Sequence, residues 1–151
     1  MAPGDPDAFI ESFRGFTRCV KGVIAQSYAE LGVGSTQAKF LRHIGRSGRM
    51  SQAELARATE TDPTLTGRAL ETLIDRGWVR RRRSEADRRQ YVLELSAAGR
   101  RACEQVEAAR ARVIQRVVGV LSPRDLADFE RITRKLREAF EDSESIPARP
   151  A

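Results

Sequence analysis

Cysteine and histidine are scarce in this sequence, where Cys19, Cys103 and His43 are the only such residues among 151. Two cysteines far apart cannot build a disulfide framework, and with one histidine they do not supply the closely spaced ligands of a zinc site. The same scarcity removes the usual pairs of nucleophile and base on which many enzymes depend. We therefore expect no metal, no cofactor and no enzymatic activity.

Long apolar runs are also missing, since no stretch approaches the ~18 residues of a membrane-spanning helix. The first seven residues are acidic and lack the apolar segment of a secretory signal. Hydrophobic residues make up 40% of the chain and charged residues 32%, which is enough apolar material for a buried core. The sequence thus predicts a soluble, cytoplasmic protein in which residues 1–151 form a single domain.

Lysine is nearly absent, and arginine supplies almost all of the positive charge. Residues 42–101 contain 14 arginines, no lysine and 8 acidic residues, so the whole net charge of +6 belongs to this middle segment. The segments on either side of it are neutral. A basic centre between neutral ends indicates one module that binds a polyanion, held between segments with a different task.

The flanking segments have the apolar periodicity of amphipathic helices. In residues 7–32 and again in residues 100–141, apolar side chains recur at steps of three and four. These side chains are Phe9, Phe13, Phe16, Val20 and Ile24 in the first segment, and Ala102, Val106, Val113, Val117, Leu121, Leu126, Phe129, Ile132, Leu136 and Phe140 in the second. Such faces are too extensive for the small central module to cover. Residues 142–151 are expected to be a flexible tail.

The basic centre begins with signals for two short helices. Ser51 and Glu54 form a capping box, which predicts a helix from Gln52 to about Thr59. Asp62-Pro63 is typical of a helix start, with the aspartate as the cap and proline in the first turn. A second helix is therefore expected from Pro63 to about Arg76. Two helices joined by such a tight turn form a helix-turn-helix, whose second helix lies in the DNA major groove.

The second of these helices has an apolar and a polar face. We expect the apolar face to pack on the core, and it consists of Leu65, Ala69, Leu70 and Leu73. On the polar face, Arg68 can pair bidentately with guanine, and Thr64 can contact a base edge or a thymine methyl group. Gly67 between them allows a close approach of the backbone to DNA, and Thr66, partly turned toward the core, is a further candidate. The alternative for each of these residues is a solvated helix face.

Alternating residues then predict an antiparallel β-hairpin with a charged tip. The tip residues Asp87, Arg88 and Arg89 would bring guanidinium groups to the minor groove or to phosphates, with Asp87 orienting Arg89 through a charge-assisted bond. Within the run Arg80–Arg83, we expect Arg82 and Arg83 to contact the DNA backbone. The alternative for this run is a solvated strand edge that is guarded against aggregation.

The stretch from Leu31 to Gly99 resembles the multiple antibiotic resistance regulator (MarR) family of bacterial winged helix-turn-helix transcription factors. The resemblance rests on Leu-Ile-Asp-Arg-Gly-Trp-Val-Arg-Arg at residues 73–81, Asp-Arg-Arg at 87–89 and Leu-Glu-Leu-Ser-Ala-Ala-Gly at 93–99. It implies a mainly α fold with six helices, two to three short strands, and a winged helix-turn-helix lobe over residues 35–99. It also implies that Asp87 and Arg89 form the tip of the wing.

The same resemblance implies a function. Members of this family are obligate homodimers, and here residues 7–32 and 100–141 would form the dimerisation region. The expected partner is double-stranded DNA with a palindromic operator. Such regulators are typically repressors that a small phenolic or other aromatic effector releases from DNA. A bacterial cytoplasmic protein that joins the nucleoid when bound is therefore expected.

Two alternatives stay open at this point. One is release by thiol oxidation, for which Cys19 is the candidate because the basic Arg18 and Lys21 lie near it; the reactive cysteine of peroxide-sensing relatives lies nearer the start of the first helix. Cys103 and His43 are expected to be structural. The other alternative is a winged-helix module that associates with a protein and binds no specific DNA.

Overall fold

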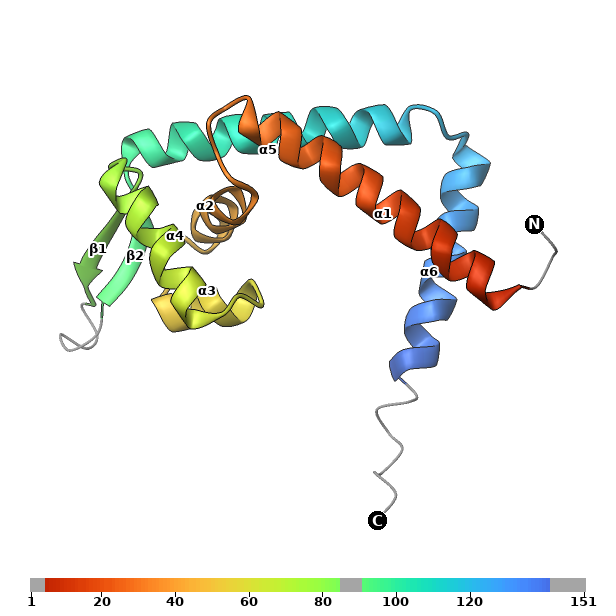
Figure 1. Cartoon of the computed structure of the whole chain (residues 1–151), viewed down its shortest axis with the longest axis horizontal. Coiled ribbons are helices and arrows are strands. Elements are labelled where there is room, and N and C mark those ends of the chain that lie inside the picture. The colour runs from red at the N-terminus through yellow and green to blue at the C-terminus, as the bar shows by residue number, and fades with distance from the viewer. Residues whose placement is uncertain (1–4, 85–90, 142–151) are drawn as a thin grey trace, which may run out of the picture. The chain divides into compact units, whose positions relative to one another are not determined.

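The computed structural model describes residues 5–84 and 91–141 and divides into two compact units, residues 1–113 and 114–151 (Figure 1). The elements in chain order are α1 (Pro6–Ala29), α2 (Ser35–Ser47), α3 (Gln52–Ala58), α4 (Pro63–Asp75), β1 (Val79–Arg83), β2 (Tyr91–Leu95), α5 (Ala97–Val118) and α6 (Pro123–Glu141). The boundary between the units falls within α5. Six helices and one two-stranded antiparallel sheet within the described residues confirm the expected mainly α fold.

Local capping sets where the first helices begin and end. Asp5 Oδ1 accepts a hydrogen bond from the N–H of Asp7 at 3.1 Å, and Pro6 occupies the first turn of α1. The chain leaves α1 through Gly32, whose φ of 66° is a conformation that residues with a β-carbon rarely adopt. At α3, Ser51 N–H donates to Glu54 Oε2 at 2.6 Å and Glu54 N–H donates to Ser51 Oγ at 3.2 Å, which confirms the predicted capping box.

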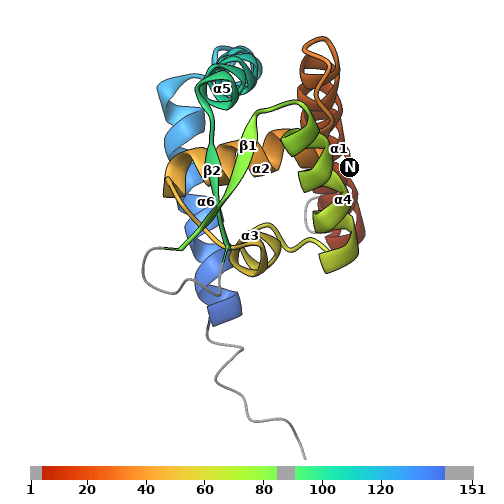
Figure 2. The same cartoon turned by 90° about the vertical axis from the view of Figure 1, so that its left-hand side faces the viewer.

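The core of the first unit lies where α2, α3, α4 and the hairpin meet (Figure 2). The apolar stripe of α2 contributes Phe40, Leu41 and Ile44, all completely buried. Other fully buried side chains come from the remaining elements and include Leu55, Leu70, Leu73, Val79, Leu93 and Val106. Burying these groups removes apolar surface from water and fixes the helix-turn-helix on the sheet.

In the hairpin, the arginine-rich strand β1 is exposed from Arg80 to Arg83, whereas Val79 is buried. Its register pairs Val79 with Leu95 and Arg81 with Leu93, so the buried side chains of β2 face the core. An isolated antiparallel β-bridge pairs Met50, two residues before α3, with Leu93 of β2. The arginines of β1 remain at the surface.

Apolar faces stay exposed in both units, each considered by itself. On α1, Phe9, Phe13 and Phe16 are about half exposed, with Phe13 at 55%. On α6, Leu126, Phe129, Ile132 and Leu136 follow one another at helical spacing, and Phe129 is likewise 55% exposed. Two amphipathic helices with uncovered apolar faces are typical of chains that associate.

Candidate nucleic-acid interface

The connection between α3 and α4 is a tight turn that hydrogen bonds fix in place. Thr59 Oγ1 donates to the carbonyl of Leu55 at 2.7 Å, and Lys39 Nζ, from α2, donates to the carbonyl of Thr59 at 2.9 Å. Beyond the turn, Asp62 Oδ1 accepts a hydrogen bond from the N–H of Thr64 at 2.9 Å. The start of α4 is therefore held against α2 and α3, as a helix that enters a DNA groove requires.

The outer face of α4 carries the polar residues expected there. Thr64, Arg68, Glu71 and Asp75 are exposed, and Gly67 is half-buried between them. Arg68 forms no ion pair with any residue that the structure describes, so its guanidinium group is available for an acceptor outside the chain. The structure thus brings Thr64, Gly67 and Arg68 together on one surface near the start of the helix.

Thr66 does not belong to that surface, which corrects the expectation that it contacts DNA. Its side chain is completely buried, and its hydroxyl donates to the carbonyl of Asp62 at 2.9 Å. Leu65, expected in the core, is 50% exposed instead. The buried face of α4 runs through Thr66, Leu70 and Leu73, because a threonine hydroxyl satisfied by the preceding turn can be buried in a helix.

Two arginines of β1 keep their guanidinium groups at the surface. Arg82 Nη1 lies 3.4 Å from Glu94 Oε1, yet the Arg82 side chain is 64% exposed. The guanidinium carbon of Arg83 lies 5.6 Å from the centre of the Tyr91 ring, which is a cation–π contact. Because the Arg82 side chain is mostly exposed, its ion pair contributes little to stability. Arg82 and Arg83 are thus placed where an outside phosphate can reach them.

Arg81 differs from its neighbours because it points back to the helix-turn-helix. Its Nη2 atom lies 2.8 Å from Glu71 Oε1 on α4 and 3.4 Å from Gln52 Oε1 on α3. Neither Glu71 nor Gln52 was predicted as a partner of Arg81. No local signal aligns a strand residue with a helix residue ten positions earlier, so this contact required the tertiary structure.

The hairpin tip lies outside the described residues. Asp87, Arg88 and Arg89 are therefore predictions from the sequence and from the family motif. The structure does describe the two strands that lead to the tip, from Val79 to Arg83 and from Tyr91 to Leu95.

The two thiols have different surroundings. Cys19 is exposed on α1. Burial, and then the nearby Glu107 carboxylate, raise the pKa of the half-buried Cys103 thiol, whose sulfur also lies 3.4 Å from the carbonyl oxygen of Leu41. A buried, protonated thiol is a poor nucleophile. Cys19 is therefore the better candidate for oxidation.

Among residues 5–84 and 91–141, no cluster of histidine, cysteine, aspartate or glutamate side chains has the arrangement of a metal site. In the same ranges, no helix combines the length and apolarity needed to cross a bilayer.

An exposed polar face on the second helix, a fixed turn before it and an arginine-bearing hairpin after it define a winged helix-turn-helix, a DNA-binding fold. Residues 31–90 match the MarR family. The HTH-type transcriptional regulator BilQ of Clostridium symbiosum is 28% identical over 102 residues, which cover 68% of this chain and 71% of BilQ. The HTH-type transcriptional repressor Rv2887 of Mycobacterium tuberculosis is 29% identical over 113 residues, covering 75% and 81%.

A solved structure has the same fold. The crystal structure of a mutant MarR from Escherichia coli, complexed with operator DNA, superposes with a TM-score of 0.68 and 22% identity over 88% of this chain and 99% of that one. The match over residues 31–90 confirms the resemblance to the MarR family of transcriptional regulators, and the motifs at residues 73–81 and 87–89 lie within it. Proteins of this family are DNA-binding regulators rather than enzymes.

Proposed function

We propose that this chain is a homodimeric transcriptional repressor that binds a palindromic operator and leaves it when a small-molecule effector binds. The observation that carries the proposal is the joined surface of α4 and β1, where Arg68 is available for an outside acceptor and Arg81 connects the strand to Glu71. The repressors among its relatives and the operator complex of its structural neighbour support the same function.

On this proposal, each part of the surface has a separate task. The helix α4 enters the major groove, where Arg68 and Thr64 contact base edges and Gly67 allows the backbone to come close. Arg82 and Arg83 bind phosphates on one side of the groove. The tip residues Asp87, Arg88 and Arg89 reach the adjacent minor groove, where narrow segments attract arginine.

The exposed apolar faces of α1 and α6 support the dimer. Each leaves several large side chains uncovered, and a second copy of the chain would remove them from water. A two-fold axis would then place two α4 helices about 34–36 Å apart, one turn of the double helix, as a palindrome requires. Sedimentation of the wild type and of Phe13→Glu tests this arrangement. We expect a dimer for the wild type and a shift toward monomer for the variant.

The effector is proposed to be a small phenolic or other aromatic molecule, as the family resemblance implies. Its binding would change the spacing of the two α4 helices, so that both can no longer enter successive major grooves. A screen of such molecules for release of a bound operator tests this part separately from DNA binding itself.

Selection of binding sites from random duplexes, followed by titration at several salt concentrations, tests the main proposal. A specific regulator should enrich one palindrome and prefer it over unrelated duplexes by at least about 10³-fold. Its affinity should also fall steeply as salt increases, because phosphate contacts release counterions. Equal binding to all duplexes, or none at all, would instead favour a winged-helix module that associates with another protein.

The exposure of Cys19 supports a second candidate mechanism, release by thiol oxidation. Peroxide should then dissociate the wild type from its operator but leave the Cys19→Ser variant bound. Cys103→Ser is the matched control, since its half-buried, protonated thiol should not be needed. Release of both serine variants by peroxide would remove oxidation of Cys19 from the mechanism.

A further inference from the structure

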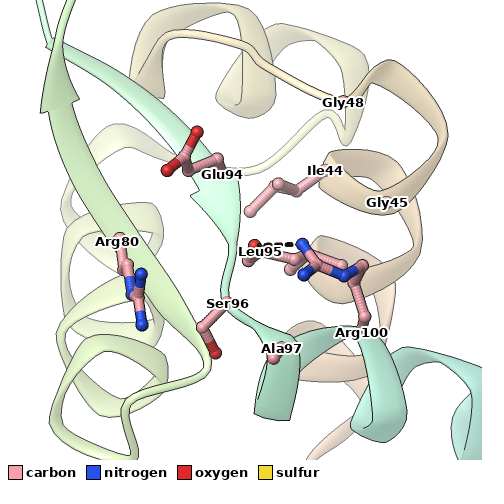
Figure 3. Close-up of a pocket in the computed structure, with 9 residues that line it drawn as sticks. All are labelled: Ile44, Gly45, Gly48, Arg80, Glu94, Leu95, Ser96, Ala97 and Arg100. Carbon is pink, nitrogen blue, oxygen red and sulfur yellow. Dashed lines mark hydrogen bonds between the residues drawn. The ribbon is translucent and has the colours of Figure 1, made fainter.

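A cavity of about 360 Å³ lies between the end of α2, the base of the hairpin and the start of α5 (Figure 3). We call it the wing-base cavity. Its apolar wall includes Ile44 and Leu95, and its polar wall consists of Arg80, Glu94, Ser96 and Arg100. Its volume falls in the range of small-molecule pockets. Thr64 and Arg68, the proposed base contacts on α4, do not line it.

Arg80 lacks the acidic partner that its position in the sheet would suggest. It is paired in register with Glu94 on the neighbouring strand. The Glu94 carboxylate, only 18% exposed, is engaged instead by Arg82 Nη1 at 3.4 Å and by Arg49 Nε at 3.6 Å. Arg80 lines the cavity and forms no ion pair within the described residues, although Glu94 lines the same cavity.

Arg100 presents a second guanidinium group to the same space. Its Nη1 atom donates to the carbonyl of Leu95 at 3.0 Å, and this bond holds the planar group at the cavity wall. No carboxylate among the described residues pairs with it. Figure 3 shows Arg80 and Arg100 on opposite sides of the cavity, with Ser96 between them.

The start of α5 adds to the positive potential at this point. The N-terminal end of a helix carries a partial positive charge that an acidic residue usually offsets. The first turn of α5 contains no acidic residue and ends with Arg100, which Arg101 follows. Like charges collected at one cavity repel one another, and a bound anion would relieve that repulsion.

We propose that the wing-base cavity binds a small organic anion, with Arg80 and Arg100 holding the oxygens of its carboxylate or phosphate group. Guanidinium groups suit this task because their planar donors match the geometry of both anions. The carbon skeleton of the ligand lies against Ile44 and Leu95. The site needs no DNA to form, so it can be tested whether or not the proposed function holds.

Isothermal titration of the full-length protein with inorganic phosphate and with succinate, at constant ionic strength, tests the proposal. We expect binding by the wild type, and binding weaker by about tenfold or more in Arg80→Gln and Arg100→Gln, because each loses charge-assisted hydrogen bonds. Arg101→Gln is the matched control: it removes the same charge from the same helical turn but does not line the cavity. Arg100→Lys, which keeps the charge, should bind more tightly than Arg100→Gln.

Two outcomes would overturn the proposal. The first is equal affinity for the probes in the wild type and in all three glutamine variants, or no measurable binding by any of them. The second is loss of affinity for duplex DNA in Arg80→Gln and Arg100→Gln, but not in Arg101→Gln, together with no binding of free phosphate or succinate. That second pattern would make the DNA backbone the occupant of the cavity. Circular dichroism of each variant checks that the fold is intact.

Discussion

Arg81 on β1 and Glu71 on α4 form an ion pair in which Nη2 lies 2.8 Å from Oε1. The two side chains are 39% and 54% exposed, so the pair itself adds only about 0–1 kcal/mol to the free energy of unfolding. The ion pair matters because of the two elements and the carboxylate that it involves. The pair fixes the hairpin relative to α4 and neutralises a carboxylate that lies three residues beyond Arg68 on the same outer face.

Arg81→Gln should therefore weaken operator binding by about 1 kcal/mol, since the unpaired Glu71 carboxylate then faces the phosphates of DNA. Glu71→Gln in the same chain should restore most of the loss, which a double-mutant cycle on operator affinity measures. A direct phosphate contact by Arg81 would give another pattern. The slope of log affinity against log salt would then fall by about 0.9, and the second substitution would restore nothing.

Replacing Arg68 and replacing Arg82 should change DNA binding in different ways. Arg68→Ala is expected to cost about 1–3 kcal/mol on the preferred operator and to relax the preference at one base position, because a bidentate base contact is lost. Arg82→Ala should weaken binding to all duplexes by a similar factor and lower the salt slope. Affinities measured for a set of single-base operator variants distinguish the two. Uniform weakening by Arg68→Ala would make Arg68 a phosphate contact.

The hairpin tip provides the next prediction, on residues outside the described ranges. Arg89→Ala should weaken operator binding by about 1–3 kcal/mol and leave the dimer intact in sedimentation. Asp87→Asn should have a smaller effect in the same direction, because Asp87 acts by orienting Arg89. Arg88→Ala is the neighbouring comparison for the loss of one tip charge. Unchanged binding by Arg89→Ala would remove the wing tip from the mechanism.

The elements of this fold were predictable wherever their signals are local. The caps at Ser51 and Asp62 act on backbone groups two or three residues away, so their sequence pattern specifies the contact. The buried residues of α2, Phe40, Leu41 and Ile44, likewise lie at helical spacing on one face, so their sequence pattern indicates which face is buried. On α4 the choice between Leu65 and Thr66 was wrong, since a threonine can be buried once its hydroxyl bonds to the preceding turn.

Polar contacts between distant elements were not predictable in the same way. The sequence predicted only that Arg82 and Arg83 contact the DNA backbone. In the structure, Arg81 contacts α4 and α3, Arg82 pairs with Glu94, and Arg80 lines a cavity. Strand alternation separates odd from even positions, but the partner of each depends on which element packs against that face. The candidate residues on the surface could thus be named from the sequence, and their division of tasks could not.

Gly99 should be essential for the fold rather than for DNA contact. A β-carbon at this position would lie 1.9 Å from the carbonyl oxygen of Trp78, and both atoms belong to rigid backbone segments. Gly99→Ala should therefore lower the free energy of unfolding by about 3 kcal/mol in a denaturant titration. Gly22→Ala on α1, where no atom lies within 4 Å, should instead raise it slightly because alanine favours helix. Equal stability of the two variants would contradict the close approach.

His43 is the only histidine of the chain, which gives stability a pH dependence that one substitution can isolate. Burial, and then the charges of Arg42, Arg46 and Lys39, hold the pKa of the folded His43 imidazole below its usual 6.5. The unfolded chain therefore binds more protons than the folded chain as the pH falls through this range. The contribution of His43 to the free energy of unfolding should be fully present above about pH 6.5, and the free energy of unfolding should decrease below that pH.

Denaturant titrations of the wild type and of His43→Gln between pH 5 and pH 8 measure this contribution. The wild type should lose stability toward pH 5, and the variant should lose less, because its side chain does not titrate. The carboxyl groups of Glu54 and Asp125 do not interfere, since hydrogen bonds from Ser51 and Ser122 hold their pKa values below the usual 4.5 and 3.8. Parallel curves for the two proteins would show that His43 has the same pKa in the folded and unfolded chains.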